Sequence, residues 1–132
     1  MTDFPIGNIQ TSDVSRVDVF SHYVNGALTT GTEKCEWIVP FNCQILSVIC
    51  DSETAGVTGG TSDIIDVNKN GTTIFTTQSR RPTLLYLDTG QFTTGVLEII
   101  SLSVGDILSY DVDQICTTGS ARFKIAILVA PR

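Results

Sequence analysis

The sequence has one histidine, His22, so a Ser-His-Asp or Cys-His catalytic site would have to be built on it. His22 lies in a β-type run in which Val17 and Val19 occupy the alternate face, so we expect it to face solvent or a neighbouring molecule. No G-x-S-x-G nucleophile motif accompanies it. We therefore predict no catalytic residue and expect the protein not to be an enzyme.

The segment Asp66-Val-Asn-Lys-Asn-Gly71 matches the first half of a calcium loop, D-x-N-x-N-G. Calcium loops place a bidentate Glu at the twelfth position, but Thr77 stands there, and Lys69 adds a positive charge. Asn70-Gly71 is also a strong signal for a two-residue β-hairpin, whose turn needs positive φ at both positions. We expect a hairpin here, and neither a metal nor another cofactor.

Asp111 and Asp113 lie two residues apart, as paired acids on one face of a strand could. A glycosidase uses two carboxyl groups in different environments, so that one is protonated and the other charged. No feature of the sequence indicates such a difference. The pair is therefore interpreted as part of a solvated strand face.

The four cysteines are Cys35, Cys43, Cys50 and Cys116, and they form no C-x-x-C pair of the kind that binds zinc. We expect buried, reduced thiols. Cys43 and Cys50 are an odd number of residues apart on one predicted strand, so they are expected on opposite faces.

The composition of the chain argues against certain classes of binding partner. A chain of 132 residues with 42% hydrophobic residues fits one globular domain. Its net charge of −6 opposes binding to nucleic acid or to an anionic membrane surface. Asp3 and Pro5 stand where a signal peptide would need positive charge and an apolar run, so we expect synthesis in the cytosol.

Short β-type runs separated by turn residues fill the chain after an extended N-terminal arm, 1–15. The domain 16–132 is predicted to be all-β: a jelly-roll β-sandwich of about eight antiparallel strands. The predicted strands cover residues 16–24, 34–39, 43–51, 63–68, 72–77, 96–100, 106–115 and 121–129.

Three segments are apolar on both faces: 45–49, 84–87 and 125–128. A two-layer domain has one core side per sheet, so the surplus apolar side chains favour an interface between copies of the chain. The alternative is that loops of the same subunit cover them.

The order of motifs resembles a known group of virion proteins. Trp37-Ile-Val-Pro40 precedes the Asp66 to Phe75 segment, and Arg81-Pro-Thr83 and Ser103 to Ile115 follow. This order is similar to small jelly-roll domains of tailed-phage virion proteins, both capsid decoration (cement) proteins and fibre heads, over about residues 33–129. The resemblance implies a homotrimer, a place in the virion and no catalytic residues.

The chain has no coiled-coil or collagen-like shaft of the kind that a fibre carries, which favours a decoration protein. Such a protein would bind the major capsid protein on the capsid exterior as an oligomer and stabilise the shell. The alternative is a receptor- or glycan-binding head of a tail fibre or baseplate. The residues expected to bind partners are Phe4, Ile6, Ile9, Arg80, Arg81, Leu84, Leu85 and Tyr86.

Overall fold

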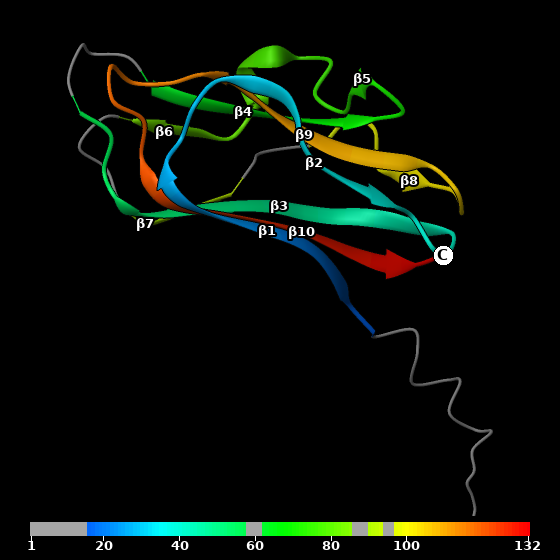
Figure 1. Cartoon of the computed structure of the whole chain (residues 1–132). Coiled ribbons are helices and arrows are strands. Elements are labelled where there is room, and N and C mark those ends of the chain that lie inside the picture. The colour runs from blue at the N-terminus through cyan, green and yellow to red at the C-terminus, as the bar shows by residue number, and fades with distance from the viewer. Residues whose placement is uncertain (1–15, 58–61, 86–89, 94–96) are drawn as a thin grey trace, which may run out of the picture.

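A computed structural model describes residues 16–57, 62–85, 90–93 and 97–132 of the chain. Two five-stranded antiparallel sheets face each other, which confirms the predicted all-β sandwich (Figure 1). The predicted arm and Tyr86 lie outside the described residues. Within the described ranges, no helix is long and apolar enough to cross a membrane.

The first sheet has the order β1-β10-β3-β7, and β8 also pairs with β3. Its strands are β1 Asp18–Ala27, β10 Ala121–Pro131, β3 Cys43–Thr54, β7 Gly90–Thr93 and β8 Ser101–Leu102. The second sheet has the order β2-β9-β4-β5, and β6 also pairs with β4. Its strands are β2 Gly31–Ile38, β9 Ile107–Gln114, β4 Ser62–Lys69, β5 Thr72–Thr73 and β6 Thr83–Leu85.

The first four strands alternate between the two sheets, and the last strand, β10, lies between β1 and β3. This order is compatible with the two Greek keys of a jelly roll. A short 3₁₀ turn over Gln78–Arg80 leads from β5 towards β6.

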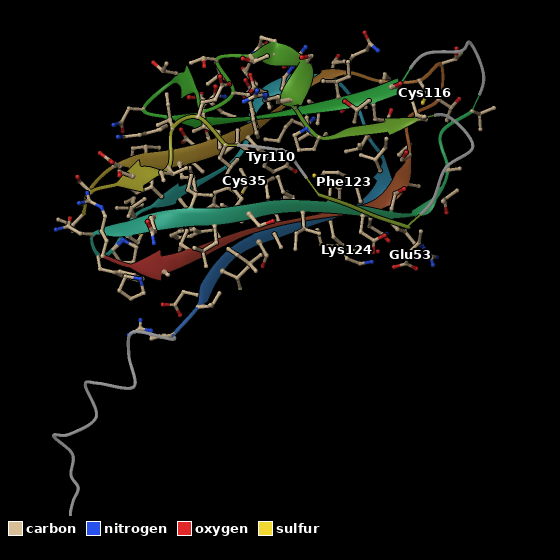
Figure 2. All side chains as sticks on the ribbon, turned by 180° about the vertical axis from the view of Figure 1, so that it is seen from behind. Cys35, Glu53, Tyr110, Cys116, Phe123 and Lys124 are labelled. Carbon is tan, nitrogen blue, oxygen red and sulfur yellow. The ribbon has the colours of Figure 1, made fainter. Side chains whose placement is uncertain are left out.

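The core lies between the sheets, and Tyr110 of β9 stands near its centre (Figure 2). The rings of Trp37 and Phe123 lie 6.2 and 6.1 Å from the Tyr110 ring, and Phe20 lies 6.0 Å from Trp37. These residues come from both sheets, so aromatic contacts join the two layers. On β10, Phe123, Ile125, Ile127 and Val129 are buried as predicted.

The predicted face of β1 is wrong. Val17 and Val19 are 51% and 55% exposed, whereas Phe20, His22 and Val24 face the core side. Both faces of this run carry apolar residues, so alternation alone does not choose between them. Phe20 faces inward because its aromatic ring packs against Trp37 of the opposite sheet.

The predicted opposite placement of Cys43 and Cys50 is also wrong, because both thiols are fully buried. Leu128 of β10 pairs with Ser47, and the next residue, Val129, pairs with Ile45. Leu46 is therefore an extra residue in β3, a β-bulge that reverses the alternation of side chains after it.

The hairpin between β4 and β5 is confirmed, with φ of +51° at Asn70 and +82° at Gly71. The strand after it is shorter than the predicted 72–77, because pairing stops at Thr73. The strand predicted over 96–100 is wrong for residues 97–100. After β7, strand pairing with β3 resumes at Ser101 and Leu102.

Candidate functional site

Three carboxylates gather on the outer surface of the second sheet. Register places Asp66 of β4 opposite Asp111 of β9, and Asp113 follows two residues later on the same face. One oxygen of each carboxylate lies within 4.8 Å of the others. The sequence contained both parts of this cluster, but only the pairing of β4 with β9 brings them together.

Asp66 is the buried member of the cluster, at 6% exposure. Burial raises the pKa of its carboxyl group, and the charge of Asp113 adds to this, while a hydrogen bond from Thr73 works against it. The Thr73 hydroxyl donates to Asp66 Oδ1 at 2.6 Å. The segment after the hairpin therefore shields Asp66 from solvent and supplies its hydrogen bond.

The other two carboxylates have partners of their own. Asp111 accepts from Asn68 Nδ2 and from the Glu33 backbone N–H, both at 2.8 Å. Asp113 Oδ2 accepts from Arg81 Nη1 at 2.6 Å. Three carboxylates suit a hard cation such as Ca²⁺ or Mg²⁺. Here Arg81 already supplies positive charge to Asp113. The hydrogen bonds of the three carboxylates form a network that connects β2, β4 and β9 to the segment before β6.

The amides of the calcium-like segment serve the fold. Asn70 Nδ2 donates to Asp106 Oδ1 at 3.1 Å, and Asn70 Oδ1 accepts from the Ile107 N–H at 2.9 Å. Asp106 also accepts from the Ser103 N–H, and these hydrogen bonds hold the pKa of its carboxyl group below the usual value. The turn thus fastens the β4–β5 hairpin to the start of β9.

His22 faces the core side, contrary to the sequence prediction. Its Nδ1 lies 2.8 Å from the Tyr110 hydroxyl, which is fully buried. Burial raises the pKa of Tyr110 to about 12. Because the phenol stays protonated at neutral pH, it can donate to His22, and the pair joins β1 of one sheet to β9 of the other.

All four cysteines are free thiols, and Cys35 is the half-buried one. Burial is the main cause that raises the pKa of each thiol. Since the thiolate is the nucleophile, these cysteines are poor nucleophiles at neutral pH.

The residues predicted to bind partners differ in burial and in contacts. Leu84 is fully buried in the core, so its side chain is not available to a partner, whereas Leu85 is 54% exposed. Arg81 is bound to Asp113, and Arg80 Nη1 lies 3.8 Å from Glu98 Oε2. Phe4, Ile6, Ile9 and Tyr86 lie outside the described residues.

A band of apolar side chains covers part of the outer surface of the first sheet. We call it the outer apolar band; it consists of Val17, Val19, Leu46, Ile49, Ala126 and Leu128, all exposed or half-buried. Val19 lies opposite Leu128, and Ala126 lies opposite Ile49. Large exposed apolar patches on proteins mark contact surfaces.

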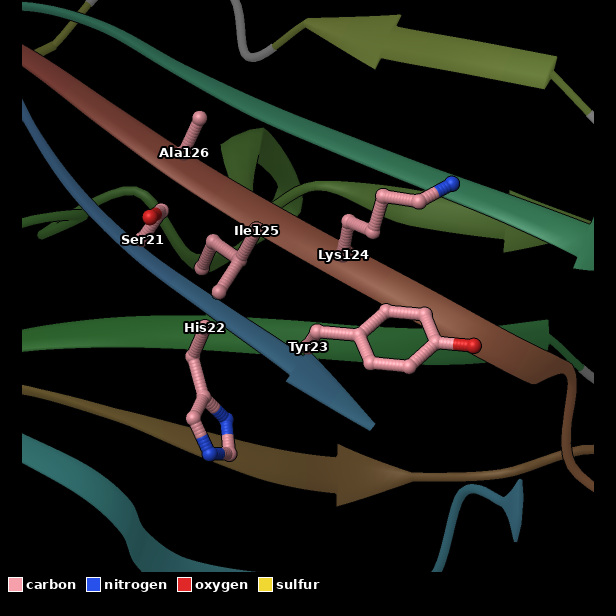
Figure 3. Close-up of a pocket in the computed structure, with 6 residues that line it drawn as sticks. All are labelled: Ser21, His22, Tyr23, Lys124, Ile125 and Ala126. Carbon is pink, nitrogen blue, oxygen red and sulfur yellow. The ribbon is translucent and has the colours of Figure 1, made fainter. Parts of the chain in front are cut away.

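Beside this band the surface of the same sheet is hollowed over about 460 Å³ (Figure 3). The small pair Ser21 and Ala126 lies next to the larger pair Tyr23 and Lys124. Figure 3 shows Tyr23 and Lys124 side by side, with His22 directed away from them. Lys124 also binds Glu53 Oε2 at 2.9 Å on this surface (Figure 2).

No protein-family model matches the chain, and neither the curated proteins nor the solved structures compared with it give a match.

The outer apolar band and the hollow beside it were only partly visible in the sequence. The sequence analysis placed four residues of the outer apolar band in segments that are apolar on both faces, but it missed Val17 and Val19 because it assigned them to the core. It also missed Tyr23, which is 47% exposed beside the hollow. The signal that could have found both was Phe20, the largest purely apolar side chain of the run, whose partial burial fixes which face of the strand points inward.

Proposed function

We propose that this protein is a structural virion protein, a capsid decoration protein that binds the outer shell as an oligomer and stabilises it. The observation that carries the proposal is the outer apolar band, because it gives a small β-sandwich a contact surface in addition to its core. The order of motifs along the sequence supports the virion setting.

Charge supports a position on the capsid exterior. The chain carries a net charge of −6, which would be repelled by packaged genome inside the shell. A contact to the major capsid protein would bury the outer apolar band, because none of its side chains is charged. The acidic remainder of the surface then faces solvent.

The test measures binding of the full chain to capsids that lack it. Leu46→Lys introduces a charge at the exposed bulge of β3, and it should weaken capsid binding about tenfold or more. Ile38→Lys is the matched control, because Ile38 is 71% exposed on the other sheet. The proposal fails when the wild-type protein does not bind capsids, or when both variants bind as well as it does.

The second candidate is a receptor- or glycan-binding head, which the hollow beside Tyr23 favours. Sugars bind to exposed aromatic faces next to polar groups, and Lys124 and Ser21 supply such groups here. Nuclear magnetic resonance titration with glycans should then shift the signals of Ser21, Lys124 and Ala126, and Tyr23→Ala should abolish these shifts. Glycan binding together with failure to bind capsids would favour the head over the decoration protein.

A further inference from the structure

The four ends of the two sheets differ in how they are protected against pairing with another molecule. Exposed edge strands are normally short, charged, bulged or interrupted by proline, because their free N–H and C=O groups can pair with a new strand. β7 and β5, at two of the ends, have four and two residues. The long strands at the other two ends are β1 and β2.

β2 is a protected edge. It carries Glu33, Lys34 and Glu36, and its pairing with β9 shifts register between Gly31 and Cys35. Glu33 also has a positive φ of +49°, which breaks the extended backbone. A second strand could not pair evenly along this edge.

β1 has none of these protections over most of its length. It spans ten residues, and no charged residue and no proline occurs from Val19 to Ala27. Its pairing with β10 is regular from Asp18 to Val24. Among the residues that the structure describes, its other edge pairs with no strand.

We propose that the free edge of β1 is a strand-pairing site for β1 of a second copy of this chain. Each copy carries a net charge of −6, so two copies repel each other wherever their charged surfaces meet. β1 is the long edge without charge beyond Asp18, and Asp18 is already paired with Arg16 at 2.7 Å. A second copy therefore fits this edge better than β2 or the charged loops.

The pairing is self-complementary when the two-fold axis passes through Ser21. An antiparallel arrangement then places the partner's Tyr23 opposite Val19 on the outer surface. Aromatic and β-branched side chains form favourable cross-strand pairs. The two first sheets join into one continuous sheet, and the outer apolar bands of both copies lie on the same face.

This inference rests on the proposed self-association and assigns it to a two-fold contact through β1, in place of the homotrimer that the resemblance implies. The first test is light scattering at micromolar concentration, where the wild-type chain should show twice its mass of 14.2 kDa. Ser21→Lys places two ammonium groups at the axis and should give a monomer, while Ile38→Lys on the β2 edge should leave the dimer intact. A trimer, a wild-type monomer, or a dimer that survives Ser21→Lys would overturn the proposal.

The second test fixes the register. Ser21→Cys should form an inter-chain disulfide under mild oxidation, because residues at the axis face each other at about 5 Å between Cβ atoms. Asn25→Cys is the control, since its two copies would stand about 26 Å apart, eight residues along the strand. Equal cross-linking of the two variants and the wild type would contradict the proposed axis.

The alternative occupant of this edge is the arm of the second copy, residues 1–15. A truncation distinguishes the two cases. Deletion of residues 1–12 should leave the dimer intact. Loss of the dimer in the truncated protein would show that the edge does not bind a second β1. Failure of this inference and failure of the proposed function give different results. A wild-type dimer that does not bind capsids refutes only the capsid role, and a wild-type monomer that binds capsids refutes only the strand pairing.

Discussion

At the scale of single residues, a buried carboxylate holds the connection between β9 and β10. Asp63 is fully buried and accepts hydrogen bonds from the N–H groups of Cys116 and Ser120, at 2.8 and 2.9 Å, and from the Ser120 hydroxyl. The connection closes onto Leu28, whose N–H donates to the Ser120 carbonyl. This approach leaves no space for a side chain at position 119.

Gly119→Ala should therefore destabilise the protein. A Cβ at this position would overlap the Leu28 carbonyl oxygen, which is backbone and has little freedom to move. We expect a loss of about 1–3 kcal/mol in the free energy of unfolding, measured by urea denaturation. Gly26→Ala is the control, because its Cβ would meet nothing within 4 Å. Equal stabilities of the two variants would contradict this account.

Asp66 gives a prediction about pH. Its pKa is raised in the folded state, so the folded protein binds a proton more readily than the unfolded chain does. The stability linked to this group is present below the unfolded pKa and is lost as pH rises through the folded pKa. Asp66→Asn removes that loss, so the variant should be more stable than the wild type at pH 7.

The advantage of Asp66→Asn should shrink as the pH falls below the pKa of an ordinary aspartate. Urea midpoints of both proteins across the acid range measure it, and Glu36→Gln serves as the control, because Glu36 is an exposed carboxylate outside the cluster. A constant difference between Asp66→Asn and wild type at all pH values would mean that proton binding at Asp66 is not the cause.

At the scale of the element, the bulge at Leu46 decides which side chains of β3 reach the core. Before it, Cys43 and Ile45 face inward; after it, Val48 and Cys50 do. An uninterrupted strand could bury only one of these two sets. The sequence offers no glycine or proline to mark the bulge, so alternation alone could not predict it.

Deletion of Leu46 should therefore cost far more than its truncation. Without the extra residue, one half of β3 turns its buried side chains to solvent, and loss of such aliphatic contacts costs at least about 3 kcal/mol. Leu46→Ala should cost less than about 1 kcal/mol, because the side chain is 46% exposed. Thermal and urea unfolding of both variants measure the difference. Similar stabilities of the two variants would contradict the claim that the bulge decides which side chains of β3 are buried.

At the scale of the whole molecule, the N-terminal arm is predicted to anchor the protein to the shell. Three apolar side chains, Phe4, Ile6 and Ile9, cannot offset the entropy of ordering 15 residues by themselves, but they can when laid on a partner. Deletion of residues 1–12 should leave a folded domain by circular dichroism and weaken capsid binding about tenfold or more.

Replacing Phe4, Ile6 and Ile9 with serine in the full chain is the control for the deletion, and it should weaken binding to a similar degree. Truncated protein that decorates capsids as well as the full chain, across a concentration series, would refute the anchoring role. The outer apolar band would then carry the attachment alone.

Much of the fold follows from the sequence, and the rest depends on contacts between distant segments. Alternation predicts the buried face of β10, and Asn70-Gly71 predicts the hairpin, because these signals are local. The face of β1 depends on Phe20 meeting Trp37 of the opposite sheet. The carboxylate cluster depends on the register of β4 with β9, which no local pattern of residues determines.

The position of β10 has a consequence for the synthesis of the protein. β10 fills the space between β1 and β3, so neither of them has its central neighbour until residues 121–131 have been synthesised. A nascent chain that stops before residue 121 leaves two long strands with unpaired backbone and exposed apolar side chains. Unfinished chains are thus open to proteases and chaperones, and only chains that reach β10 can close the first sheet.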